Sequence, residues 1–157
     1  MTRLEIDDLL KGSLGELYFK HYCRQHNYLY AKTEHIAREF TAEKRAVTFV
    51  MGFDRVPIRI PKEMVTEVFR ASQPTNEASP SYVVDFLTCT NWKENRGESP
   101  QDFAWVEVKT GYSELTANQM RFREECKLRF CIFRIPKVWL PPRLVHVNWE
   151  EDLPMKA

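Results

Sequence analysis

Residues 103–109, Phe-Ala-Trp-Val-Glu-Val-Lys, constrain the fold more than any other part of the chain. Side chains of a β-strand alternate between its two faces, so Glu107 and Lys109 would project side by side, together with two aromatic residues. The opposite face would be wholly apolar, which indicates a strand packed into a core. An ionisable pair on such a strand is costly unless it is paired, binds a metal or lies at an edge open to water.

A second strand-like segment, residues 82–87, carries a single acid, Asp85. The polar stretch between Asp85 and Glu107 is long enough for two adjacent strands joined by a hairpin loop. A turn that contains Gly111 follows Lys109, and a helix is expected to begin near Thr116, with Gln119 in its first turn. The chain thus presents an acid, a hairpin, a Glu-x-Lys strand and a polar residue on the next helix.

This order of residues resembles the PD-(D/E)XK nuclease superfamily, in particular its Holliday-junction-resolvase-like and VRR-nuclease branches. In element order the resemblance covers roughly residues 12–135, although residues 31–79 match no motif of the family. It implies an α/β (α+β) fold with a restriction-endonuclease-like core, in which helices flank a central mixed β-sheet on both faces.

The composition predicts one globular domain over residues 1–157, because 157 residues with 43% hydrophobic side chains can build one core and are too few for two. The 23 basic and 22 acidic residues nearly balance, which excludes a strongly basic nucleic-acid coat. No apolar run reaches the length of a membrane span, and the N-terminus lacks a signal-peptide pattern. We expect a soluble cytoplasmic protein without membrane association.

The resemblance implies divalent-metal chemistry at the two acids. Mg²⁺, or Mn²⁺ in its place, prefers oxygen ligands, and the implied ligands are Asp85, Glu107 and the main-chain carbonyl of Val108. Lys109 would orient or deprotonate the attacking water and offset negative charge, so that DNA phosphodiester bonds are hydrolysed. The alternative for Lys109 is a structural salt bridge to an acid on a neighbouring strand.

Gln119 has two interpretations. Thr116 and Gln119 have the spacing of a capping box at the start of a helix that is expected to run to about Leu128, which explains Gln119 without any catalytic role. Gln119 also lies on the helix stripe of Phe122 and Cys126, which must face the sheet. The resemblance favours an orientation toward Lys109, so Gln119 is also a candidate catalytic residue.

Glu16 is a further candidate catalytic residue, on a helix expected between residues 4 and 24. The helical spacing predicts that the core-facing stripe contains Leu14, Leu17 and His21, and that Glu16 lies in an adjacent row of small and apolar residues. Gly12, one turn earlier, would let another backbone approach. The alternatives are a capping box at residues 13–16 and an ion pair with Lys20.

The four cysteines, Cys23, Cys89, Cys126 and Cys131, lack paired CxxC spacing and are expected to be buried reduced thiols. A zinc site built from Cys126, Cys131 and a histidine is the alternative.

The remaining segments predict the outer parts of the domain. A strand is expected at Ala46–Met51, an exposed or edge strand at residues 55–60, a short helix from Pro61 through Arg70, and strands at Arg129–Ile135 and 144–147. Residues 27–45 read as a polar connector and 73–81 as a loop. The polar loop at 91–101 is expected close to the site, either contacting substrate or as a disordered surface loop. Five basic residues form either a phosphate-contacting edge or scattered surface charges: Lys44, Arg45, Arg55, Arg59 and Lys62.

Two classes of function follow from these patterns. The first is a divalent-metal-dependent DNA endonuclease, and the second is a catalytically silent nucleic-acid-binding or protein-interaction domain on the same scaffold. Within the first class, the sequence does not distinguish a structure-selective resolvase that acts as a homodimer from a monomeric or partner-fused endonuclease.

Overall fold

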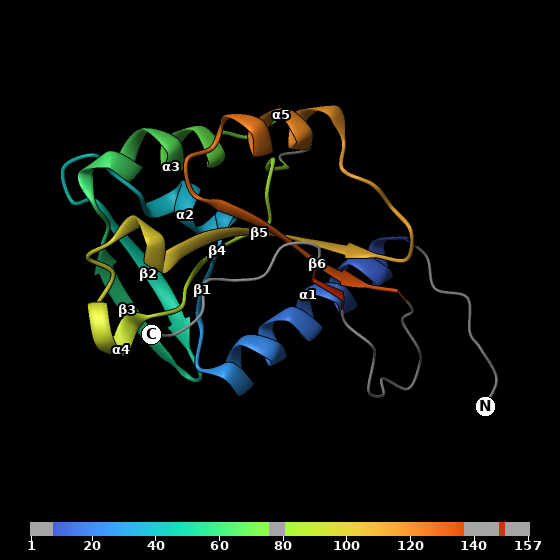
Figure 1. Ribbon diagram of the computed structural model, residues 1–157, viewed down its shortest axis with the longest axis horizontal. Helices are drawn as coiled ribbons and strands as arrows, with labels where there is room; N and C mark the ends of the chain where they lie inside the picture. Colours follow the sequence, from blue (N-terminus) through green and yellow to red (C-terminus); the bar gives the residue numbers. More distant parts are fainter. Residues whose placement is uncertain (1–7, 76–80, 137–147, 150–157) are drawn as a thin grey trace.

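The computed structural model describes residues 8–75, 81–136 and 148–149, which are organised around one mixed β-sheet (Figure 1). Its seven strands lie in the order β3-β2-β1-β4-β5-β6-β7. Their bounds are β1 Leu29–Lys32, β2 Ala46–Met51, β3 Asp54–Arg59, β4 Phe86–Cys89, β5 Phe103–Thr110, β6 Arg129–Ile135 and β7 Asn148–Trp149. Neighbouring strands are antiparallel except for β5 and β6, which are parallel and joined through a helix.

Helices cover both faces of this sheet. Their bounds are α1 Asp8–His26, α2 Thr33–Glu39, α3 Val65–Ala71, α4 Trp92–Asn95 and α5 Ala117–Glu125. Figure 1 shows α2, α3 and α5 on one side of the strands and α1 on the other. The predicted α+β class with a central mixed sheet is confirmed.

Strand β5 divides the core as its alternating sequence predicts. Phe103 and Trp105 belong to the larger apolar cluster, on the side of α3 and α5, whereas Ala104 and Val106 pack with Phe19 of α1 in a second cluster. The buried Trp105 indole donates from Nε1 to Glu67 Oε2 of α3 at 2.8 Å. Glu107, two residues after Trp105, therefore lies on the α5 side of the sheet.

The buried face of α1 differs from the predicted stripe. Leu17 is 59% exposed and His21 is also exposed, whereas Phe19 and Cys23 are fully buried. Both rows have helical spacing, so periodicity alone could not choose between them. Gly15 decides the rotation, because its missing side chain lets α1 lie directly against β5.

Two elements were missed inside the predicted polar connector. Strand β1 pairs antiparallel with β4 along all four of its residues and lies in the interior of the sheet, and α2 follows it. The strand is short and half polar, which hid it from pattern analysis. The strand predicted over residues 82–87 begins later, at Phe86, so Asp85 lies immediately before β4.

The outer elements follow their predictions in most places. β3 is the edge strand of the described sheet, and the segment after Pro61 forms a 3-10 turn at Lys62–Met64 that leads into α3. The predicted loop at 91–101 contains α4 and part of a second 3-10 turn, Pro100–Asp102. The strand predicted at residues 144–147 lies outside the described residues.

Candidate active site

The site is built on the paired ends of β4 and β5. The register joins Phe86 to Val106, so the next position places Asp85 opposite Glu107. The Asp85 carboxylate accepts a hydrogen bond on Oδ2 from the main-chain N–H of Val108 at 2.8 Å. This bond holds Asp85 against the Glu-x-Lys segment although Asp85 itself is outside the strand.

Glu107 is a buried acid, with only 3% of its surface exposed. Burial raises its pKa well above the ordinary value of 4.5, and the charge of Asp85 and a side-chain hydrogen bond between the two acids raise it further. Lys109 acts in the opposite direction, and Glu16 adds a smaller upward effect. The Glu107 carboxyl therefore keeps its proton to a higher pH than an exposed glutamate does.

Gln119 satisfies both of its interpretations at once. Its backbone N–H donates to the Thr116 hydroxyl and its side-chain oxygen accepts from the Thr116 N–H, so the predicted capping box is present. Its side-chain amide nitrogen donates a hydrogen bond to Glu107 Oε2. Because the amide oxygen is engaged at the helix start, the nitrogen is oriented toward the buried acid.

Lys109 lies on the same strand face as Glu107, two residues further along β5. Its ammonium makes no salt bridge with any acid whose side chain the structure describes. Its influence on the Glu107 pKa shows that the two groups are close enough to interact. The structure therefore gives no support to the alternative of a structural salt bridge on a neighbouring strand.

Glu16 reaches the site from the other face of the sheet. A Cβ on its neighbour Gly15 would lie 2.9 Å from Thr110 Cγ2 and 3.1 Å from Val108 Cγ1, so only glycine permits this approach of α1 to β5. At Gly12, which the sequence predicted for this role, an added Cβ would meet no atom of another described element within 4 Å. Glu16 pairs with Lys32, with 3.2 Å between Oε2 and Nζ, rather than with the predicted Lys20.

Lys32 is a member of this cluster that sequence reasoning missed. It ends β1, directly opposite Phe86 of β4. Burial pulls its pKa down, but the carboxylates of Glu16, Glu34 and Asp85 outweigh this effect and raise the pKa above its ordinary value. A lysine at the end of an alternating Leu-Tyr-Ala-Lys run was the available signal, and the shortness of that run concealed it.

The donor atoms suit a hard divalent cation. A strand residue directs its N–H and C=O toward the same neighbour, so the Val108 carbonyl faces the Asp85 side of β5 as its N–H does. Asp85 and Glu107 place two carboxylates side by side, and a cation bound between them would relieve the repulsion that helps to raise the Glu107 pKa. Among the described residues no group of three or more His, Cys, Asp and Glu could hold a metal, and the expected set has only two carboxylates with a main-chain oxygen.

The zinc alternative is wrong. Cys126 packs against the larger apolar cluster and Cys131 belongs to the cluster on the α1 face, so the sheet separates the two thiols. All four cysteines are free, and three of them are buried. Burial raises the pKa of Cys89 to about 12 and that of Cys23 further still, as expected of thiols in apolar surroundings.

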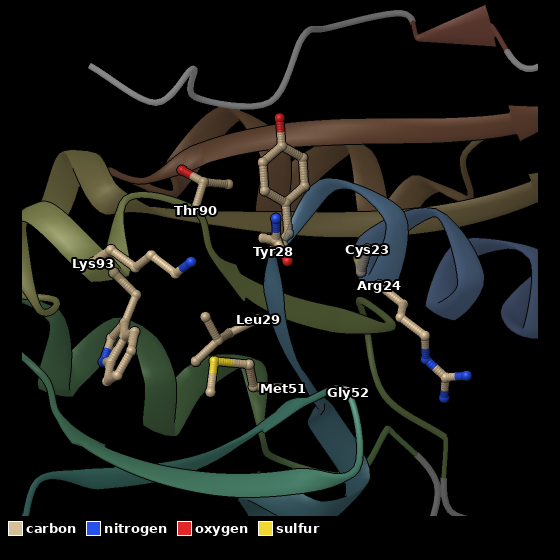
Figure 2. A pocket seen from close by; sticks show the side chains of 10 residues that line it. Cys23, Arg24, Tyr28, Leu29, Met51, Gly52, Thr90 and Lys93 are labelled. Carbon is tan, nitrogen blue, oxygen red and sulfur yellow. The ribbon is translucent and has the colours of Figure 1, made fainter.

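The 91–101 loop lies away from the site, contrary to prediction. It joins the end of β4 to the start of β5, where Cys89 pairs with Phe103, whereas Asp85 and Glu107 lie at the opposite end of the hairpin. A pocket of about 280 Å³ beside this loop is lined by Leu29, Met51 and Lys93 among others (Figure 2). None of the predicted site residues lines it.

Comparison with known proteins returns no relative: no protein-family model, curated protein or solved structure matches the chain significantly. In the described part of the chain, no helix has the length and apolar character needed to cross a membrane.

Proposed function

We propose that the chain is a divalent-metal-dependent DNA endonuclease of the PD-(D/E)XK type. The observation that carries this proposal is the buried Glu107, which contacts Asp85, just before the preceding strand, and Gln119 of the following helix, with Lys109 beside it. These residues come from three separate elements, and a purely structural role for Glu107 would not require them to converge on one partly open sheet end. Their order along the chain is the one that supports the family resemblance.

Each residue has a chemical task in this proposal. Asp85, Glu107 and the Val108 carbonyl would hold Mg²⁺ or Mn²⁺, which when bound acidifies water and stabilises charge on a phosphodiester. Gln119 fixes the orientation of the Glu107 carboxylate, and the Val108 N–H fixes that of Asp85. The Lys109 ammonium orients the attacking water and offsets negative charge on the phosphate. The Glu16–Lys32 pair borders the site and positions Lys32 near Asp85.

The direct experiment is incubation of the purified protein with plasmid, single-stranded and branched DNA, with magnesium, manganese or chelator. The proposal predicts phosphodiester cleavage that requires the divalent ion, and the preferred DNA form reports whether the enzyme is structure-selective as a resolvase is. DNA binding without cleavage under every metal condition would instead support the silent nucleic-acid-binding scaffold.

A further inference from the structure

Strands β1 and β2 separate shortly after they meet. Their register contains one pair, Tyr30 with Val50, although β2 pairs with β3 along its whole length. Continued pairing would set Lys32 opposite Thr48, and this pair is absent. A pocket of about 280 Å³ occupies the gap, between β1, β2 and α2. Since Lys32 lines the pocket and contacts Glu16, the gap opens directly beside the candidate active site.

Basic side chains line part of this gap, and one of them, Lys32, is paired with Glu16 and Glu34. Lys20 of α1, Lys32 of β1 and Arg55 of β3 line the pocket together with His35, and Glu39 is the one acid among its described lining residues. Three elements that are distant in sequence thus contribute cations to one concave surface. The near-neutral charge of the whole chain gave no sign of this concentration.

The positive surface continues past the pocket. Tyr30 pairs with Val50, and Val50 pairs with Arg55, so these residues lie side by side across β1, β2 and β3. Burial raises the pKa of Tyr30, and the charges of Arg24 and Arg55 oppose this rise. The Arg24 guanidinium lies 4.8 Å from the ring centre of Phe53, which is 93% exposed in the turn between β2 and β3. The cations of Lys20, Arg55 and Arg24 therefore lie between the pocket and an exposed aromatic ring.

Among the helices of residues 8–75 and 81–136, none covers this side of β2 and β3. Thr48 and Val50 are only partly buried, and Arg55 and Pro57 are exposed, whereas Val47 and Phe49 on the other face are in the core. In Figure 1, α1 runs past β1 and leaves the β2–β3 hairpin beside it. We use the name basic groove for this pocket, lined by Lys20 and Arg55, together with the Arg24–Phe53 pair at the β2–β3 turn.

We propose that the basic groove binds the phosphate backbone of a single nucleic-acid strand that extends from the candidate active site toward the β2–β3 turn. This inference rests on the proposed function, because a polymeric substrate must continue beyond the phosphate that is cleaved. Lysine and arginine contact phosphates without reading sequence, and an exposed ring such as Phe53 offers a surface on which a base can stack. The surface beside the site therefore selects a strand rather than a small phosphodiester.

The test measures affinity for a fluorescein-labelled single-stranded DNA oligonucleotide by anisotropy, in chelator and at several salt concentrations. Arg55→Ala and Lys20→Ala should each weaken binding by roughly three- to tenfold and reduce the slope of log K against log salt by about 0.7. Lys127→Ala removes one positive charge just after α5, on the opposite face of the sheet, and should stay within about twofold of wild type.

Affinities and salt slopes of Arg55→Ala and Lys20→Ala equal to those of Lys127→Ala would overturn the groove, as would an absence of single-strand binding by the wild type. The groove would also be overturned if duplex DNA binds more tightly than the single strand and neither Arg55→Ala nor Lys20→Ala weakens that binding. Because binding is measured without divalent metal, the result does not depend on cleavage. A protein that binds through the groove but never cleaves DNA would refute the proposed function and leave the groove standing.

Discussion

The carboxylate of Asp85 accepts a hydrogen bond from the main-chain N–H of Val108, the residue between Glu107 and Lys109. This bond ties an acid outside the sheet to the centre of the Glu-x-Lys segment. The Val108 N–H therefore orients the Asp85 carboxylate by a contact within the protein. The same contact places the Asp85 charge next to the buried Glu107, which is an unfavourable neighbour for a second carboxylate.

Asparagine at position 85 separates these two effects. Asp85→Asn keeps an oxygen that can accept from the Val108 N–H but removes the charge beside Glu107, so unfolding in chelator should need at least as much denaturant as for wild type. Asp85→Ala leaves the N–H unpaired and should lose about 1–3 kcal/mol of unfolding free energy. Denaturant titrations in chelator measure both; equal stability of the two variants would contradict the role of the bond. Both variants should lose DNA cleavage.

Thr116 provides the matched control for Gln119. Thr116→Ala and Gln119→Ala each remove one arm of the capping box and should each cost about 1 kcal/mol of stability. Only Gln119 contacts Glu107, so Gln119→Ala should lower the cleavage rate at least about tenfold more than Thr116→Ala. Melting temperatures and single-turnover rates of the two variants decide the matter. Equal losses of stability with equal rates would leave Gln119 as a capping residue only.

The raised pKa of Glu107 makes the metal-free protein sensitive to pH. An acid with a higher pKa in the folded state keeps its proton there while the unfolded chain releases it. The stabilisation is therefore complete below the ordinary value of 4.5 and is lost as pH rises through the folded-state pKa. Unfolding free energy in chelator should fall with pH by at most about 1.4 kcal/mol per unit from this group, and Glu107→Gln should remove that decline.

Magnesium should oppose this fall of the unfolding free energy with rising pH. A cation bound by the Asp85 and Glu107 carboxylates stabilises the folded state by mass action. The melting temperature of the wild type should rise with millimolar magnesium, more at pH 8 than at pH 5. That of Glu107→Gln should stay nearly constant, because magnesium should stabilise this variant by about 1 kcal/mol or less. A wild-type melting temperature that magnesium leaves unchanged at both pH values would count against a preformed two-carboxylate site.

Gly15 and Gly12 form an internal control for the packing of α1 against β5. Alanine at Gly15 would place Cβ 2.9 Å from Thr110 Cγ2, and the overpacking should cost about 1–3 kcal/mol. Alanine at Gly12 meets open space and should gain up to about 1 kcal/mol from helix propensity. Thermal or chemical unfolding of the two variants tests this difference in sign. A stabilised Gly15→Ala protein would show that α1 can withdraw from β5 at no cost.

The site could be predicted to the extent that its residues lie on regular elements. Alternation along residues 103–109 placed Glu107 and Lys109 on one face, and the Thr116–Gln119 spacing located the start of α5, both as observed. The residue order supplied Asp85 even though β4 begins at Phe86, four residues later than expected, and leaves Asp85 outside the strand. Local periodicity carries this information because each residue's orientation depends only on its own strand or helix.

Features that depend on pairing between distant segments could not be predicted. β1 is a four-residue strand with no strong pattern, so neither Lys32 nor the gap between β1 and β2 was visible. The rotation of α1 depends on the contact between Gly15 and Thr110, which lie far apart in the sequence. The place of the 91–101 loop follows from the direction of the β4–β5 hairpin, since the loop must lie opposite the end that holds Asp85 and Glu107.

Plasmid cleavage in magnesium by wild type and by Glu107→Gln tests the central claim most directly. Glutamine preserves the size of the buried side chain and removes only the acid, so the variant should fold, as circular dichroism can verify. We expect wild-type cleavage that chelator abolishes, and a loss of at least about a thousandfold in Glu107→Gln, equivalent to about 4 kcal/mol of transition-state stabilisation. Cleavage by folded Glu107→Gln at the wild-type rate would contradict the assignment of this site.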